Sequence, residues 1–168
     1  MPKVMRRVSV RKKERKVFLR KISEILGIEA EKIFGSKPQI EIIDTKRCKL
    51  YLINGAPLIG VLEGIIFPTL FFKKYVNHLP KVTVDMGAVP YICNGADVMA
   101  PGVIRIDGDF EEKALVAVID ERNKRPIAVV YSLFNSEKTS SIERGKVFRN
   151  LHYVGDEIWR LMKDVFRA

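Results

Sequence analysis

Most of the chain consists of short runs of strand-forming residues that are separated by turns. In the first half these runs cover residues 39–44, 49–53 and 58–66. The dipeptide Asn54-Gly55 joins the last two runs, and it predicts a tight hairpin because both residues tolerate positive φ. Short helical segments are expected over 29–34 and 68–76. This pattern indicates a small α+β domain.

The second half continues the alternation of short strands and glycine turns. Strands are expected over 81–84, 103–106, 115–119, 127–133 and 147–153, and the runs 115–119 and 127–133 are almost continuously apolar. Short helices are expected before Asn94 and over 135–142, where Ser136 is the predicted N-cap. An amphipathic helix closes the chain. Many short strands with a few helices predict a closed or nearly closed β-barrel.

The segment 77–80 reads as a linker, because the composition changes there from basic to balanced. The sequence therefore predicts two domains, 1–78 and 79–168. The fold class is α+β, with a small N-terminal α+β domain followed by a β-barrel that carries short helices.

Charge is distributed very unevenly along the chain. The net charge is +10 at pH 7, and residues 1–21 hold ten Lys or Arg and one Glu. Residues 80–168 hold thirteen residues of each sign. An excess of this kind favours polyanionic partners, with nucleic acid ahead of acidic membranes.

The basic segment is predicted to form a helix that ends at Gly27. Phe18, Ile22 and Ile25 have the i, i+4, i+7 spacing of an apolar stripe, flanked by Leu19 and Leu26. This stripe is narrow and is expected to enter the core, which argues against a helix that lies on a membrane surface.

A second stripe on the same helix is basic. Lys12, Lys16 and Arg20 follow one another at i, i+4 and i+8, and Glu14 is the only acidic residue before Glu24. The ordinary alternative is a solvated outer face, but such faces usually mix both signs and gain from Glu–Lys pairs. We therefore expect these three side chains to contact phosphates.

Several classes of protein are disfavoured. Cys48, Cys93, His78 and His152 are too scattered for a zinc site, so no metal and no cofactor are expected. The chain has no nucleotide-binding glycine loop and no nucleophile motif, and no catalytic residues are predicted. A secretory signal and a membrane span are also absent from the pattern, so we expect a cytoplasmic protein without membrane attachment.

A set of motifs in the second half resembles the PUA domain, which is named after pseudouridine synthases and archaeosine transglycosylases. In chain order they are Val84-Asp85-Met86-Gly87-Ala88, Asn94-Gly95-Ala96, Pro101-Gly102, Gly108-Asp109-Phe110, Ile127-Ala128-Val129 and Tyr131-Ser132. The motifs lie at the expected spacing. The resemblance implies that 79–168 is a PUA domain, preceded by a domain that accompanies it.

Further motifs narrow the resemblance to the malignant T-cell-amplified protein family and its archaeal counterparts. They are Phe67-Pro68-Thr69-Leu70, Lys74-Tyr75, Asn150-Leu151-His152-Tyr153, Asp156 and Trp159. The family is similar in turn to part of ligatin, a translation initiation and recycling factor. Membership implies a non-catalytic RNA-binding protein that acts in translation. The implied partners are the small ribosomal subunit, the acceptor end of transfer RNA and a second translation-factor protein.

The resemblance also implies where RNA would lie on the second domain. Gly87, Ala88 and Gly95 match the family's backbone approach to RNA, although the glycines could instead satisfy turn geometry alone. The basic candidates are Lys138, Arg144, Lys146 and Arg149. Arg105 is expected to be neutralised by nearby acids, His152 and Trp159 are expected to pack, and Tyr91 could either stack or pack.

A second function stays open at this point. The chain could be an accessory subunit that presents transfer or ribosomal RNA to a separate modification enzyme. Co-purification with ribosomal subunits would favour the role in translation.

Overall fold

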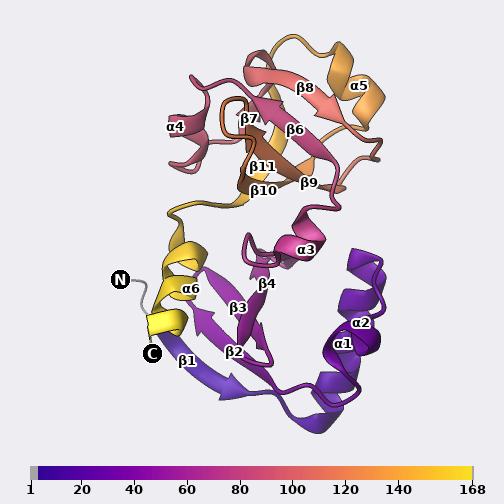
Figure 1. Ribbon diagram of the computed structural model, residues 1–168, viewed down its shortest axis with the longest axis vertical. Helices are drawn as coiled ribbons and strands as arrows, with labels where there is room; N and C mark the ends of the chain where they lie inside the picture. The colour runs from indigo at the N-terminus through magenta and orange to yellow at the C-terminus, as the bar shows by residue number, and fades with distance from the viewer. Residues whose placement is uncertain (1–3, 168) are drawn as a thin grey trace.

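The computed structural model describes residues 4–167, which form two sheets stacked along the long axis of the molecule (Figure 1). The first sheet has five antiparallel strands in the order β1-β2-β3-β4-β5. The second has six strands in the order β7-β11-β10-β9-β6-β8, in which only the pair β6–β9 is parallel. The α+β class predicted from the sequence is confirmed.

The first sheet is covered by helices on both faces (Figure 1). Its strands are β1 (Val4–Ser9), β2 (Ile40–Thr45), β3 (Cys48–Ile53), β4 (Ala56–Leu62) and β5 (Ile65–Pro68). Helices α1 (Lys12–Leu26) and α2 (Ala30–Phe34) pack on one face. Helix α6 (Glu157–Arg167) packs on the other, although it comes after the whole second sheet.

The second sheet curls around its own apolar core. Its strands are β6 (Lys81–Val84), β7 (Val98–Met99), β8 (Val103–Asp107), β9 (Leu115–Asp120), β10 (Pro126–Ser132) and β11 (Lys146–Tyr153). The helical segments are α3 (Lys73–Val76), which joins the sheets, then α4 (Val89–Ile92), η1 (Ala100–Gly102) and α5 (Ser136–Ser141). This arrangement is the expected barrel with short helices.

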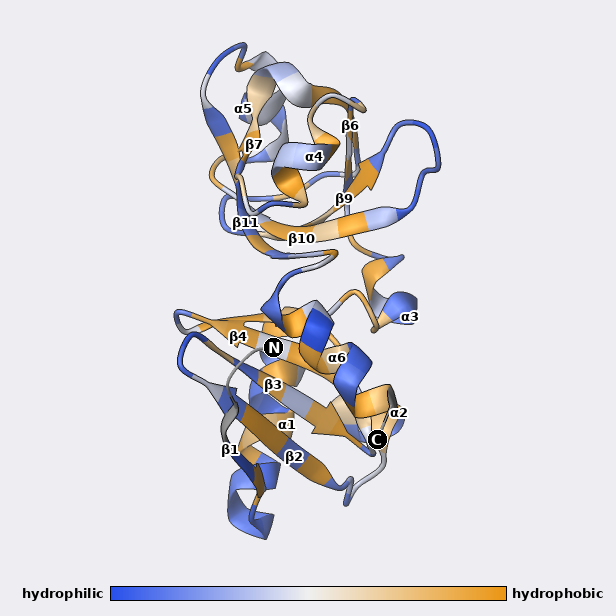
Figure 2. Ribbon diagram, turned by 90° about the vertical axis from the view of Figure 1, so that its left-hand side faces the viewer, coloured by the Kyte–Doolittle hydropathy of each residue, from blue (hydrophilic) through white to orange (hydrophobic). Residues whose placement is uncertain are grey.

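Strands β9 and β10 are buried on both faces, which explains their almost unbroken apolar sequence. Val116, Val118 and Val130 point into the barrel core, whereas Ala117 and Val129 join a cluster that includes side chains of the first sheet. Figure 2 shows both strands mostly in the hydrophobic colour. The two domains are therefore joined by a shared core.

Three local predictions need correction, and two strands were missed. The run 58–66 is two strands, because Glu63 and Gly64 form a turn with φ of 49° and 79°. The N-cap of α5 is Asn135, whose side chain accepts a hydrogen bond from the Lys138 N–H, so it is not Ser136. Pro68 ends β5, and helix α3 begins only at Lys73. Strands β1 and β7 were not predicted.

The position of α6 bears on the division into domains. Its side chains Ile158, Leu161 and Met162 are buried in the cluster that contains Leu50 and Leu52 of β3. The last helix thus returns to the N-terminal sheet. The predicted boundary between residues 78 and 79 stays a prediction. Helix α6 belongs to the second segment in the chain, but it packs on the sheet of the first.

Candidate nucleic-acid interface

Helix α1 is fixed to the first sheet by the apolar stripe found in the sequence. Phe18, Leu19, Ile22 and Leu26 are buried, and the Phe18 ring stacks on Tyr51 of β3 with 4.2 Å between ring centroids. Ile25 is the exception, since 46% of it is exposed. The helix ends as predicted at a glycine with φ of 64°.

The basic stripe lies on the exposed side of α1. Lys12, Lys16 and Arg20 are all exposed, and none of them takes part in an ion pair with another residue of the described range 4–167. By contrast, Arg6 and Arg7 of β1 pair with Asp44 and Glu41 at 3.6 and 2.9 Å. The uncompensated charge of the N-terminal segment is therefore concentrated on α1.

Two of these residues lie beside a small hollow between α1 and the turn that follows α2. The hollow has a volume of about 320 Å³, and its lining includes Lys12, Lys16 and also Lys37. The Arg15 guanidinium, which lines it too, donates to the Pro38 carbonyl at 3.4 Å. Lys37 was not among the predicted site residues, because only the fold brings its turn next to α1. Arg20 lies outside this hollow.

The structure gives a clear local cause for one of the two predicted glycines of the barrel. Gly95 has φ of 99°, and a Cβ added there would lie 3.2 Å from the Tyr153 hydroxyl. Gly87 is exposed, while the Ala88 N–H donates to the Asp85 carboxylate at 2.8 Å. Turn geometry and close packing thus account for Gly95 without a ligand, and the Ala88 N–H already has a partner.

The four basic candidates of the barrel have different surroundings. Lys146 pairs with Asp97 at 2.8 Å, and Arg149 pairs with Glu63 of the N-terminal domain while it lies over the Tyr131 ring. Lys138 lies over the Phe134 ring at 4.8 Å. Arg144 is exposed and has no ion pair among the described residues. Arg144 is thus the cation of this set that is most available to a ligand.

Three further predictions can be compared with the structure. Arg105 is neutralised by Asp107 at 2.8 Å, and His152 is fully buried, so both predictions are confirmed. Trp159 is half-buried and packs against the shared core. Tyr91 is 71% exposed on α4, close in sequence to Gly95. The sequence left its role open, and the structure leaves its ring accessible.

The thiols are poorly suited to chemistry at neutral pH. Burial raises the pKa of the Cys48 thiol to about 11 and also raises the pKa of Cys93. A thiol with a raised pKa is mostly protonated and is a weak nucleophile. Within residues 4–167 no three His, Cys, Asp or Glu side chains are grouped so as to hold a metal ion. In the same range no helix is long and apolar enough to cross a membrane.

Comparisons with known proteins agree with this architecture. The family model of the PUA domain matches residues 80–154, and that of a domain of unknown function (DUF1947) matches residues 6–76. A hypothetical protein of Pyrococcus horikoshii has a similar structure, with a TM-score of 0.75 and 30% identity over 94% of this chain and 99% of that one. A PUA-domain protein of Aeropyrum pernix, solved as a tartrate complex, gives a TM-score of 0.77 at 26% identity over 95% and 93% of the two chains.

The fold and the two family models that match it together define a two-domain PUA protein. An uncharacterized protein of Methanocaldococcus jannaschii is 37% identical over 88% of this chain and 87% of its own length. A malignant T-cell-amplified sequence 1 homolog of Dictyostelium discoideum is 31% identical over 77% and 75%, and translation machinery-associated protein 20 of Saccharomyces cerevisiae is 28% identical over 77% and 76%. The chain belongs to the malignant T-cell-amplified protein family, as its motifs predicted.

Proposed function

We propose that this protein is a non-catalytic RNA-binding factor of translation, which contacts the small ribosomal subunit and the acceptor end of transfer RNA. The observation that carries this proposal is the basic stripe of α1, whose exposed Lys12, Lys16 and Arg20 have no ion-pair partners among the described residues. Phosphate contacts supply most of the affinity of basic proteins for nucleic acids. The name of the yeast relative, translation machinery-associated protein 20, agrees with such a role.

The barrel would supply the contacts to an RNA end. Tyr91 offers an exposed aromatic ring on α4, and Arg144 offers an unpaired cation. An unpaired base can stack on an aromatic ring, and this mode of recognition is common for single-stranded RNA ends. Lys138, Lys146 and Arg149 would add attraction, and Gly87, Ala88 and Gly95 would let the backbone approach the RNA. The same proposal includes a second translation-factor protein as a binding partner.

Sedimentation with purified small ribosomal subunits, with and without transfer RNA, tests this function. The wild-type protein should sediment with the subunits, and binding should increase when transfer RNA is present. The variant in which Lys12, Lys16 and Arg20 are changed to Ala should stay largely in the supernatant. Failure of the wild-type protein to sediment, together with co-purification with an RNA-modification enzyme, would contradict the proposal in favour of an accessory subunit.

A further inference from the structure

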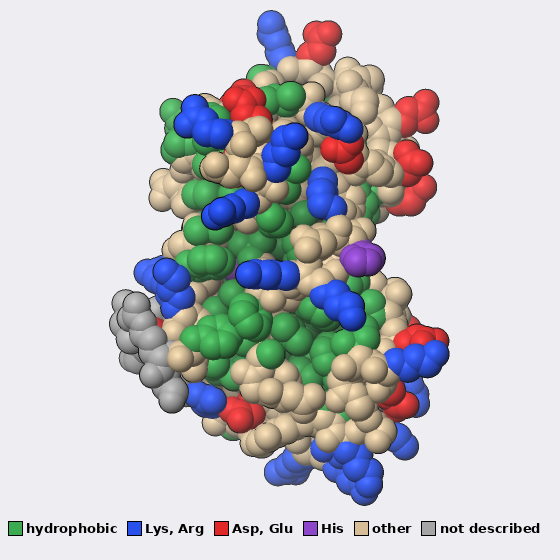
Figure 3. All heavy atoms as spheres, in the orientation of Figure 1, with side chains coloured by type: hydrophobic (Ala, Val, Ile, Leu, Met, Phe, Trp, Pro, Cys, Tyr) green, Lys and Arg blue, Asp and Glu red, His purple; other side chains and the backbone are tan. Residues whose placement is uncertain are grey.

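An apolar groove crosses the junction of the two domains. Two hollows of about 620 and 480 Å³ form it, and they adjoin because both are lined by Tyr75 and Leu79. We call it the seam groove and define it by six lining residues, Ile25, Ile33, Ile65, Tyr75, Leu79 and Leu115. Figure 3 shows hydrophobic side chains gathered over this waist of the molecule.

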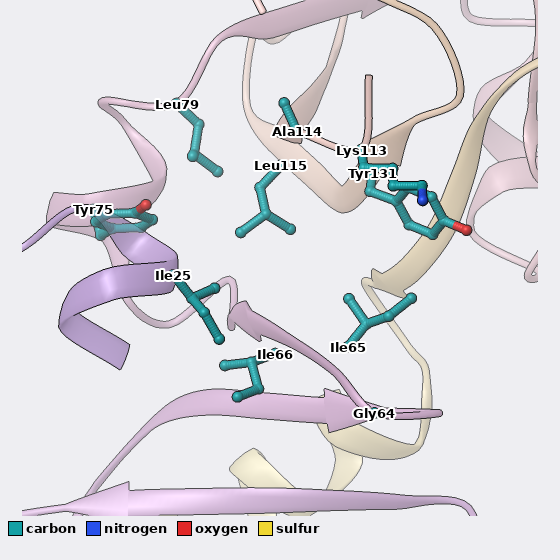
Figure 4. A pocket seen from close by; sticks show the side chains of 10 residues that line it. All are labelled: Ile25, Gly64, Ile65, Ile66, Tyr75, Leu79, Lys113, Ala114, Leu115 and Tyr131. Atoms are coloured by element: carbon teal, nitrogen blue, oxygen red, sulfur yellow. The ribbon is translucent and has the colours of Figure 1, made fainter. Parts of the chain in front are cut away.

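Both domains contribute to the larger hollow. Figure 4 shows Ile25 of α1 and Ile65 of β5 on one side of the space, and Leu115 of β9 and Tyr131 of β10 on the other. Ile25 is 46% exposed, and Ile33, in the adjoining hollow, is 50% exposed. Single exposed apolar residues are normal, but a contiguous apolar hollow that is open to solvent marks a binding surface.

The charged side chains that line the groove are basic. Lys113 and Lys74 belong to its lining together with His78, and the lining contains no acidic side chain among residues 4–167. Glu63 adjoins the lining residue Gly64 but is already paired with Arg149.

Lys113 has an unusual backbone conformation. Its φ of 66° lies in the left-handed region, which residues with a side chain adopt much less readily than glycine. Its N–H donates to the Ser132 carbonyl at 2.7 Å, which holds this conformation. A basic side chain is therefore kept at the rim at a position where glycine would be less strained. Strain of this kind is concentrated at functional sites.

We propose that the seam groove binds an apolar segment of a partner protein whose flanking residues are acidic. An amphipathic helix presents apolar residues at i, i+3, i+4 and i+7, which suits an open apolar groove. Acidic residues beside that stripe would pair with Lys74 and Lys113. Since the lining offers few hydrogen-bond donors, it suits the apolar face of a peptide better than an RNA backbone.

This surface is separate from the proposed RNA interface. At about 100° per residue, Ile25 lies on the opposite side of α1 from Lys16. One helix would then contact RNA phosphates with one side and the partner protein with the other. The inference rests on the proposed function in one respect, the second protein partner, and adds the surface and the chemistry that would bind it; the groove can bind this partner whether or not α1 binds RNA.

Selection from a random 16-residue peptide library displayed on phage tests the proposal. The full-length protein serves as bait, and the double variant Ile25→Glu/Ile33→Glu serves for counter-selection. Enriched peptides should carry apolar residues at helical spacing with flanking Asp or Glu. As synthetic peptides they should bind the double variant at least about tenfold more weakly than the wild type. The matched control is Val17→Glu/Ile104→Glu, two residues that are 65% and 52% exposed outside the groove, and it should bind like the wild type.

Several results would overturn the proposal. These are the absence of any enriched sequence, enrichment of peptides with basic flanks, and peptides that bind the double variant as tightly as the wild type. A dimer that sediments as such in the wild type and dissociates in Ile25→Glu/Ile33→Glu would assign the groove to a second copy of the chain. Loss of RNA binding in that variant would assign it to RNA, whereas unchanged RNA binding separates this test from that of the proposed function.

Discussion

His152 in β11 accepts a hydrogen bond from the backbone N–H of Leu70 across the domain junction, with 3.1 Å between Nε2 and N. Its other ring nitrogen, Nδ1, lies 2.8 Å from the Asp156 carboxylate. Because Nε2 accepts, the neutral ring carries its proton on Nδ1 and donates it to Asp156. The ring is fully buried, so one side chain connects the end of the barrel to the segment that follows β5.

Replacing this imidazole should therefore weaken the whole molecule. We expect His152→Ala to lower the free energy of unfolding by about 2–4 kcal/mol, because it leaves a cavity and an unpaired buried N–H. Urea unfolding followed by Trp159 fluorescence would measure the change. His78→Ala is the matched control, since His78 is exposed, and it should change stability by less than about 0.5 kcal/mol. Equal effects of the two substitutions would contradict a role for His152 in joining the domains.

The C-terminal helix makes a second prediction about stability. Leu161 is 3% exposed and packs in the core shared by the two domains, whereas Phe166 at the end of α6 is 58% exposed. Leu161→Ala should therefore cost about 2–5 kcal/mol, the range for a large buried side chain, and Phe166→Ala should cost clearly less. Thermal unfolding of both variants is the measurement. If Leu161→Ala is as mild as Phe166→Ala, α6 does not hold the N-terminal sheet.

Local sequence patterns predicted the elements whose cause is local. The strand 81–84 was predicted with its observed limits, and Asn54-Gly55 forms the expected turn with φ of 51° and 83°. The turn at Glu63-Gly64 has similar angles but was missed, because glutamate is not a typical turn residue and apolar runs flank it. Strand β1 was missed because its arginines gave the segment a basic rather than an alternating pattern.

Other features could not be predicted because they depend on contacts between residues that are distant in the chain. No local pattern indicates that α6 covers the N-terminal sheet, or that the second face of β9 and β10 meets the other domain. Helical periodicity did place Lys12, Lys16 and Arg20 on an exposed face. The partner of Arg149, Glu63, lies 86 residues away in the chain, so its neutralisation could not be predicted.

The role of the basic stripe can be measured by salt dependence. Changing Lys12, Lys16 and Arg20 to Ala should weaken RNA binding and reduce the slope of log K against log salt concentration by roughly two to three units, at about 0.7–0.9 per phosphate contact. The triple change of Arg122, Lys124 and Arg125 to Ala removes the same charge from the exposed β9–β10 loop, and it should leave the slope nearly unchanged. Equal slopes for both triple variants would mean that α1 acts only through the total charge.

If the barrel recognises an RNA end, its affinity should differ between RNAs with and without a single-stranded end. Arg144→Ala and Lys146→Ala should each leave stability within about 0.5 kcal/mol, since Arg144 is exposed and the pair Lys146–Asp97 lies at the surface. Both should lower affinity for a stem with a single-stranded 3′ end more than for a blunt stem. Arg144→Ala should have the larger effect, because Lys146 is already paired. An equal loss on both RNAs would indicate diffuse attraction.

Tyr91 provides the sharpest test of the same surface. If an unpaired base stacks on its ring, Tyr91→Ala should cost about 1–3 kcal/mol of binding energy for the RNA with a single-stranded 3′ end, the range found for one stacked base. Tyr91→Phe keeps the ring and is the matched control, with affinity close to that of the wild type. The blunt stem should not distinguish the three proteins. Because Tyr91 is 71% exposed, its replacement should not alter folding, so a loss of affinity confined to the overhanging RNA is a direct effect. Equal affinities of Tyr91→Ala and the wild type for that RNA would place the contact with the RNA end elsewhere on the barrel.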